Sequence, residues 1–283
     1  MDFYQDLYKV YLNSDRIIID DNSKIIIMSD CHRGINTNKD NFKNVEPIFI
    51  ESLKYYLSNE YTYIELGDGD ELWENNDINK IIKAHYNSFK IMSKLYENNR
   101  FYMLYGNHDM SKKDINVLSK LEYYDNLPLF PNIKIRESLI LKYDNNDILL
   151  IHGHQGDYIN DKMWILGKFI SKYVWSYLES FKTKLANEET YNNSDIGLTK
   201  QRFINWSIIY NKMIIAGHTH KISFPNIKEH MYFNDGSASY NNYITGIEIV
   251  NGSISLVKWS IIDNNIKKEI LTSPVRLKKY FKQ

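Results

Sequence analysis

The feature that most constrains this chain is a series of short apolar runs that each end abruptly at Asp, Gly, Asn or His. Apolar runs of about four to eight residues with such boundaries predict buried β-strands. The runs lie at residues 24–29, 61–66, 101–105, 148–151 and 213–216. Because open α/β sheets bind ligands at the carboxyl ends of their strands, we expect the polar residues that follow these runs to form the functional site.

Longer segments between the first three runs, residues 45–57 and 72–96, have helical periodicity. This alternation predicts β-α-β units around a mostly interior sheet, and the fold class is α/β. From residue 158 to 210 the pattern is helical alone, which we interpret as a helical cap inserted into a single domain that spans residues 1–283. An amphipathic helix is expected at residues 2–15, which lack the basic start of a secretory signal.

Beyond residue 220 the apolar runs again have strand character, at residues 231–233, 243–250 and 254–259. The Asn251-Gly252 pair between the last two runs is a strong signal for a tight hairpin turn. These runs predict an antiparallel sheet edge. The basic segment that follows, residues 267–282, suits a solvated end or a surface contact, including a peripheral one with a membrane.

The charge and cysteine content exclude several classes of protein. Lys plus Arg equals Asp plus Glu at 35 each, so no net field draws the whole molecule to nucleic acid or to an anionic membrane. No apolar stretch is long and uncharged enough to predict a transmembrane helix. The single cysteine, Cys31, rules out an internal disulfide and suits a reducing compartment, which predicts a cytoplasmic protein. Nothing in the sequence predicts the oligomeric state.

Five short clusters of metal-ligand residues follow the predicted strands. They are Asp30-Cys31-His32, Gly67-Asp68, Gly106-Asn107-His108-Asp109, His152-Gly153-His154 and Gly217-His218-Thr219-His220. Imidazole, carboxylate and amide oxygen together suit Mn, Fe or Zn better than Ca or Mg. We therefore expect transition-metal ions, with manganese favoured.

Each cluster taken alone also suits a structural role. Asp30 could cap a helix, and Gly106-Asn107 could form an ordinary turn. A single histidine such as His152 is often only hydrogen-bonded. Residues two apart on an extended backbone point the same way, however, so Asp30 and His32 could converge on one ion, as could His218 and His220. A single cluster would not predict a metal site, but five such clusters at strand ends do.

The order of the clusters resembles that of the calcineurin-like metallophosphoesterases, whose pattern is D-x-H, G-D-x-x-[DE], G-N-H-[DE], H and G-H-x-H. The resemblance runs from about residue 24 to about residue 250. It implies a four-layer sandwich of two mixed β-sheets flanked by helices. In the second block, the pattern selects Glu71 rather than Asp70 as its last acid, and we interpret Glu71 as a group that supports the ligands.

The resemblance also implies two metal ions that share Asp68. Matched position by position, the ligands of one ion are Asp30, His32, Asp68 and His220, and those of the other are Asp68, Asn107, His152 and His218. Such a pair of ions can generate a hydroxide from water, and the hydroxide attacks phosphorus in line. His108 is expected to protonate the leaving oxygen, and Asp109 to orient or charge its imidazole.

The reaction type is clearer than the substrate. The Glu71-Leu72-Trp73 sequence, the His152-Gly153-His154-Gln155-Gly156-Asp157 block and the helical segment after it look like the UDP-2,3-diacylglucosamine pyrophosphatase-like branch, in whose lipid A enzymes the insertion covers acyl chains. Trp164, Phe169, Trp175 and Tyr177 would form such a cover here, although aromatic residues at this spacing also suit a plain core.

One departure from that branch concerns His108, because its best-known lipid A enzymes have arginine there. We therefore expect a small phosphorylated substrate, a phosphodiester or pyrophosphate of nucleotide type or a nucleotide-sugar lipid. Arg33 and His154 are the predicted substrate contacts, and loop or turn roles are the alternatives. The alternatives for the whole protein are a metal-free scaffold that binds proteins, a phosphomonoesterase, or a nuclease, and the balanced charge gives no strong signal for nucleic acid.

Overall fold

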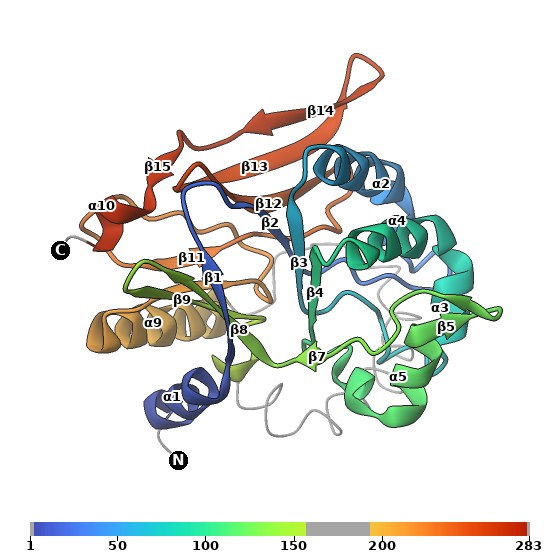
Figure 1. Cartoon of the computed structure of the whole chain (residues 1–283), viewed down its shortest axis with the longest axis horizontal. Coiled ribbons are helices and arrows are strands. Elements are labelled where there is room, and N and C mark those ends of the chain that lie inside the picture. Colours follow the sequence, from blue (N-terminus) through green and yellow to red (C-terminus); the bar gives the residue numbers. More distant parts are fainter. Residues whose placement is uncertain (1–2, 157–192, 282–283) are drawn as a thin grey trace.

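A computed structural model describes residues 3–156 and 193–281, which form a sandwich of two mixed β-sheets with helices on both outer faces (Figure 1). This is the architecture that the sequence predicts. All five strands expected from the apolar runs are present, within two residues of the predicted limits. No helix in the described residues is both long and apolar enough to cross a bilayer.

The larger sheet has a parallel half and an antiparallel half. In spatial order its strands are β14 (Asn265–Ile270), β13 (Ser253–Ile262), β12 (Tyr243–Val250), β2 (Lys24–Met28), β3 (Thr62–Leu66), β4 (Phe101–Leu104) and β7 (Ile135–Arg136), and β15 (Val275–Arg276) also pairs with β13. Strands β2, β3, β4 and β7 run parallel, whereas β12 runs antiparallel to β2 and to β13. The loops after β2, β3 and β4 therefore leave the sheet at one edge.

The smaller sheet brings the remaining clusters to the same region. Its order is β1 (Asp15–Ile19), β8 (Ser138–Tyr143), β9 (Asn146–Ile151), β10 (Met213–Ala216) and β11 (Tyr232–Asn234). Strands β9, β10 and β11 are parallel, so the loops after β9 and β10 also share an edge. A separate two-stranded ribbon joins β5 (Tyr123–Tyr124) to β6 (Leu127–Pro128).

Three apolar clusters separate the four layers. Alternate residues of β2 belong to different clusters: Ile26 and Met28 pack against the helices, whereas Ile25 and Ile27 face the other sheet. Strand β9 divides in the same way, with Leu150 facing the opposite sheet and Leu149 in the cluster beneath the helices on its outer face. Because both faces of these strands are buried, their sequences are continuously apolar.

The helices on the larger sheet are α2 (Phe42–Ser58), α3 (Ile78–Ala84), α4 (Tyr86–Glu97) and α5 (Ile115–Glu122). The sequence pattern at residues 72–96 predicts one helix, but the structure has two shorter ones. Asp77 caps α3, because its side chain accepts a hydrogen bond from the backbone N of Asn79. His85 interrupts the helix with a φ of −119° and a ψ of 33°. Its imidazole contacts Asp40 and Glu46, which fixes the break.

The smaller sheet is covered by α1 (Phe3–Asn13) and α9 (Asn193–Tyr210), which pack together beneath it (Figure 1). Leu7 of α1 and Trp206 of α9 are buried in the same apolar cluster, as the amphipathic pattern at the amino terminus predicts. The predicted cap at residues 158–210 lies mostly outside the described residues, as do Trp164, Phe169, Trp175 and Tyr177. Its last part is α9, which packs on the sandwich.

The carboxyl-terminal strands form the predicted antiparallel edge. Asn251 and Gly252 both have positive φ, at 51° and 63°, as a tight hairpin between β12 and β13 requires. The basic tail forms β14, β15 and α10 (Leu277–Phe281). It is anchored rather than wholly solvated, because Leu277 and Tyr280 are buried in the core between the sheets.

Candidate metal centre

Seven predicted ligands lie on loops at the carboxyl ends of five strands. Asp30 and His32 follow β2, Asp68 follows β3, Asn107 follows β4, His152 follows β9, and His218 and His220 follow β10. Six of them form two compact groups, in which the ligand atoms lie within 4.8 Å of one another: Asp30 with His32 and His220, and Asp68 with His152 and His218. The structure thus gathers side chains that are up to 190 residues apart in the sequence.

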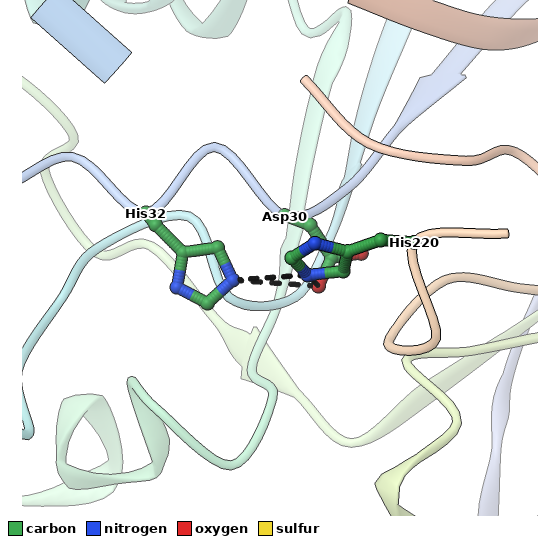
Figure 2. Close-up of side chains that lie close together, drawn as sticks. All are labelled: Asp30, His32 and His220. Carbon is green, nitrogen blue, oxygen red and sulfur yellow. Dashed lines mark hydrogen bonds and ion pairs between the residues drawn. The ribbon is translucent and has the colours of Figure 1, made fainter. Parts of the chain in front are cut away.

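The first group is a triangle of one carboxylate and two imidazoles. His32 and His220 turn their rings toward the carboxylate of Asp30 (Figure 2). Nε2 of His220 lies 3.0 Å from Oδ1 of Asp30, Nε2 of His32 lies 3.6 Å from the same oxygen, and the two nitrogens are 3.3 Å apart. Ligand atoms on a tetrahedral Zn²⁺ are separated by about 3.3–3.4 Å, given bonds of about 2.0–2.1 Å. The observed spacing therefore fits one shared cation.

The second group adjoins the first. Nε2 of His152 lies 3.0 Å from Oδ2 of Asp68, and Asp68 in turn lies 3.9 Å from Nε2 of His32. His152 also approaches Oδ1 of Asp30, at 3.9 Å. Asp68 and His152 of the second group thus each approach a member of the first.

The histidine tautomers suit metal binding. Nδ1 of His152 donates to the carbonyl oxygen of Leu66 over 3.0 Å, and Nδ1 of His32 donates to Oε2 of Glu71 over 3.1 Å. Each bond places a proton on Nδ1 and leaves Nε2 facing the site, so the neutral form of each ring would offer the lone pair of Nε2 to a cation, as most metal-bound histidines do. Nε2 of His152 is buried and makes no hydrogen bond, although it lies close to Asp68. The residues present therefore fit divalent cations.

Opposite charges within the centre shift the ionisation of its members. Burial alone would raise the pKa of Asp30, but the imidazoles of His220 and His152 hold that pKa well below its usual value. Burial lowers the pKa of His152, and the carboxylates of Asp68 and Asp30 outweigh it and raise that pKa to about 9. Interlocked carboxylates and imidazoles of this kind are typical of functional sites.

Five of the predicted ligands have a left-handed backbone. The φ angles are 55° at Asp30, 49° at His32, 49° at Asp68, 67° at His218 and 53° at His220. The sequence argument that each D-x-H or H-x-H pair converges because its backbone is extended is therefore wrong. The side chains converge because the strands end in tight turns, whose left-handed conformations cost of order 1–3 kcal/mol each at non-glycine residues.

Small residues make room for this packing. A Cβ at Gly106 would lie 2.2 Å from Oδ1 of Asp68, and one at Gly217 would lie 2.1 Å from the hydroxyl of Ser29. Ser29 hydrogen-bonds both Asp30 and Asp235, and a φ of 93° at Gly67 turns the chain into the loop that carries Asp68. The glycines that precede three of the clusters are thus explained by close approach and by backbone conformation.

His108 lies at the mouth of the centre. Its backbone N donates to Oδ1 of Asp68 over 2.8 Å, and its ring Nδ1 donates to Oε2 of Glu71 over 2.8 Å. The indole of Trp73 stacks on the imidazole, with centroids 4.0 Å apart. Burial lowers the pKa of His108, but the carboxylates of Glu71 and Asp68 raise it above its usual value. The side chain keeps 23% of its surface exposed, so it can reach a ligand.

The contacts of Asp109 do not fit the role predicted for it. Its carboxylate accepts hydrogen bonds from the backbone N of Gly106 and of Gly69, at 2.7 and 3.0 Å, and from Nζ of Lys112 at 2.7 Å. It is fully buried and turned away from His108, whose imidazole is held by Glu71 instead. The sequence identified Glu71 only as a supporting group and did not link it to His108.

The two predicted substrate contacts are buried. Arg33 has no exposed surface, and its guanidinium is engaged by Glu65 and Asp70, so its geometry does not fit contact with a substrate phosphate. His154 is 1% exposed, and burial together with His152 holds its pKa well below the usual value. Cys31 is buried in the core.

Asp235 is a residue of the centre that sequence analysis missed. It is fully buried, and its Oδ1 lies 2.8 Å from the hydroxyl of Ser29, which also bonds Asp30. Burial and the charge of Asp30 raise the pKa of Asp235 well above its usual value. The signal was available, because Asp235 follows a short apolar run, as the metal-ligand clusters do.

Comparison with known families gives a match over most of the chain. The family model described as calcineurin-like phosphoesterase matches residues 23–222, the part that holds all five clusters. A comparison with curated proteins found no significant match.

Several solved structures are similar to this chain at low sequence identity. A predicted phosphoesterase from Streptococcus pneumoniae has 15% identity and a TM-score of 0.37, covering 88% of this chain and 97% of that one. Vacuolar Protein Sorting 29 from Cryptosporidium parvum has 11% identity and a TM-score of 0.42, covering 90% and 98%. A putative 5'-nucleotidase from Staphylococcus aureus has 12% identity and a TM-score of 0.39, covering 88% and 53%.

Proposed function

Because this chain belongs to the calcineurin-like phosphoesterase family, we propose that it hydrolyses a phosphodiester or pyrophosphate bond with the help of two divalent cations. The observation that supports this most is the pair of adjacent ligand groups, Asp30 with His32 and His220 and Asp68 with His152 and His218. Asn107, on the loop that carries His108, completes the second group in the proposal. A mixture of imidazole and carboxylate oxygen favours Mn²⁺, with Fe or Zn as alternatives.

Bound cations would supply two things, a lower pKa for a water molecule and neutralisation of charge on the phosphoryl oxygens. The protein supplies the rest. Asp68 stands between the two ligand groups, and the Nδ1 hydrogen bonds of His32 and His152 fix their rings. These contacts set the ligand positions before substrate arrives, so little reorganisation is needed during the reaction.

His108 is the proposed general acid. It is exposed enough to reach a leaving oxygen, and Nδ1 is committed to Glu71, so the proton is delivered from Nε2. Glu71 accepts hydrogen bonds from both His108 and His32 and thereby ties the acid to a proposed ligand. Trp73 stacks on the ring and restricts its orientation. We assign to Glu71 the orienting role that the sequence suggested for Asp109.

The proposed substrate is a small phosphorylated molecule of nucleotide or nucleotide-sugar type, and likeness to the UDP-2,3-diacylglucosamine pyrophosphatase-like branch remains part of the proposal. The predicted acyl-binding cap spans residues 158–210, of which residues 158–192 lie outside the described part of the chain. A cytoplasmic location is proposed as well, supported by a single cysteine, Cys31, that is buried.

The test is a substrate panel assayed with Mn²⁺ and with a chelator. It contains p-nitrophenyl monoesters and diesters, nucleotide sugars and cyclic nucleotides. We expect hydrolysis that requires the metal and favours diesters or pyrophosphates over monoesters. Purified protein that binds no Mn²⁺ and hydrolyses nothing would instead support a protein-binding scaffold, and preference for monoesters would change the substrate class.

A further inference from the structure

Five charged side chains are completely buried behind the proposed metal centre, and none of them belongs to the ligand set. They are Arg33, Glu65, Asp70, Asp109 and Lys112. Lys, Arg, Asp and Glu are almost never fully buried unless they are paired. This cluster, the buried ion network, joins the loops that follow β2, β3 and β4.

Arg33 links the first loop to the second. Its Nη1 and Nη2 donate to the two carboxylate oxygens of Glu65, at 2.7 and 2.9 Å, and its Nε donates to Oδ1 of Asp70 at 2.8 Å. The guanidinium lies over the ring of Phe89, 5.0 Å from its centroid. This bidentate geometry fixes the orientation of arginine in a way that a lysine ammonium cannot reproduce.

Lys112 links the second loop to the third. Its Nζ lies 2.7 Å from Oδ2 of Asp70 and 2.7 Å from Oδ2 of Asp109. Asp109 in turn accepts hydrogen bonds from the backbone N of Gly69 and of Gly106. One lysine thus holds the carboxylate that joins the loop of Asp68 to the loop of Asn107 and His108.

The backbone of the ligand loops follows this network closely. The N of His32 donates to the carbonyl oxygen of Asp68 over 2.9 Å, and the N of Arg33 donates to that of Gly69 over 3.0 Å. A Cβ at Gly69 would lie 2.2 Å from Oε1 of Glu65 and 2.6 Å from Nη2 of Arg33. The turn that carries Asp68 therefore rests directly on the Arg33–Glu65 pair.

A buried ion network is weak evidence for stability, because apolar residues of similar volume often stabilise a fold as much or more. We propose that Arg33 and Lys112 are positioning residues, which hold the loops of Asp30, Asp68 and Asn107 at the separation that two cations require. The inference rests on the proposed metal centre and assigns it a support that lies outside the ligand set. Supporting contacts around metal ligands commonly change metal affinity by about 10- to 100-fold.

The experiment measures Mn²⁺ affinity of the full-length protein by titration calorimetry, beside thermal unfolding of the metal-free protein. The variants are Lys112→Met and Arg33→Lys. Lys112→Met removes the positive charge of the lysine side chain. Arg33→Lys keeps a positive charge but loses the paired hydrogen bonds to the two carboxylate oxygens of Glu65. Lys268→Met is the matched control, because it breaks an ion pair of 2.9 Å with Glu248 between β14 and β12. We expect Mn²⁺ affinity to fall about 10- to 100-fold in the first two and to stay unchanged in the control.

If Lys112→Met does not fold, the Mn²⁺ affinity of Arg33→Lys alone tests the inference. Wild-type affinity in a folded Arg33→Lys or Lys112→Met protein would overturn it. So would an equal loss of affinity in Lys268→Met, because that loss would reflect general stability. A wild-type protein that binds no Mn²⁺ would refute the proposed metal centre and the inference with it, and this outcome is recognisable before any variant is made.

Discussion

The carboxylate of Glu71 holds the imidazole of His108, with Oε2 accepting a hydrogen bond from Nδ1 over 2.8 Å across 37 residues of sequence. The same oxygen accepts from Nδ1 of His32 over 3.1 Å. Glu71 lies within 2.9 Å of His108 with both carboxylate oxygens, whereas it contacts His32 with one, and His32 is one of three members of its ligand group. Disturbing Glu71 should therefore affect the proton donor more than the metal content.

Replacing the orienting carboxylate is the first test. In Glu71→Gln, the carboxylate that accepts hydrogen bonds from His108 and His32 is replaced by an amide. The NH₂ group of the amide cannot accept a hydrogen bond, so His108 loses its fixed orientation. We expect kcat to fall about 10- to 100-fold with Mn²⁺ content retained. The measurements are steady-state kinetics and metal analysis on the same preparation. Glu97→Gln, at the exposed end of α4, is the control and should match the wild type.

Removing the proposed acid should separate chemistry from metal binding. We expect His108→Ala to lower kcat by about 10²- to 10⁴-fold, the usual contribution of general acid catalysis, and to keep its Mn²⁺. The loss should be smaller for p-nitrophenyl esters, whose leaving group needs less protonation. Parallel loss of metal and activity would make His108 a ligand.

A change within the first ligand group should have the opposite signature. In His220→Ala, the triangle with Asp30 and His32 loses one corner, so we expect at least one equivalent of Mn²⁺ to be lost together with activity. Metal analysis after gel filtration measures the stoichiometry. Full Mn²⁺ occupancy in this variant would contradict the ligand assignment.

Gly106 tests the close packing of the centre. An alanine Cβ there would lie 2.2 Å from Oδ1 of Asp68 and 2.6 Å from the ring of His152. Since both neighbours are backed by buried structure, we expect Gly106→Ala to weaken Mn²⁺ binding and to lower the melting temperature. Gly197→Ala in α9 is the control: its Cβ would meet no atom within 4 Å, so a helix gain of up to about 1 kcal/mol is expected.

His85 should make the free energy of unfolding depend on pH. Its ion-pair partners, Asp40 and Glu46, are not among the proposed metal ligands. Burial lowers the pKa of His85, but the carboxylates of Asp40 and Glu46 raise it from 6.5 to about 9. Because the folded pKa is the higher one, the stabilisation is complete below about pH 6.5 and is lost as pH rises through about 9. The shift corresponds to about 3 kcal/mol.

Denaturant unfolding of wild type and His85→Gln between pH 6 and pH 10 measures this effect. We expect the difference in unfolding free energy to be largest at pH 6 and to shrink toward pH 10. A difference that does not change with pH would mean that the pKa of His85 is the same in the folded and the unfolded protein. His230→Gln, at a half-buried histidine whose pKa is lowered chiefly by burial, serves as the comparison.

The strands were predictable from sequence because burial on both faces leaves a continuous apolar run, as in residues 25–28 and 148–151. The position of the site followed, because polar clusters come directly after those runs and parallel strands end at one edge. Residues 15–19 and 138–143 were not recognised as strands. Asp20 and Asp144 follow these two runs directly, so the boundary signal was present in the sequence. The parallel pairing of the two strands is visible only in the sheet.

The identity of the candidate ligands and the family came from the order of residue types along the chain, which requires no knowledge of side-chain direction. Which carboxylate holds His108, and whether Arg33 faces the ligand or the core, were decided by tertiary structure alone. Left-handed turns at Asp30, His32 and Asp68 set the directions of these loops, and Asp109 and Arg33 turn inward to satisfy buried partners. The direction of each of these side chains depends on contacts between loops that lie tens of residues apart in the sequence. Local sequence patterns do not reveal such contacts.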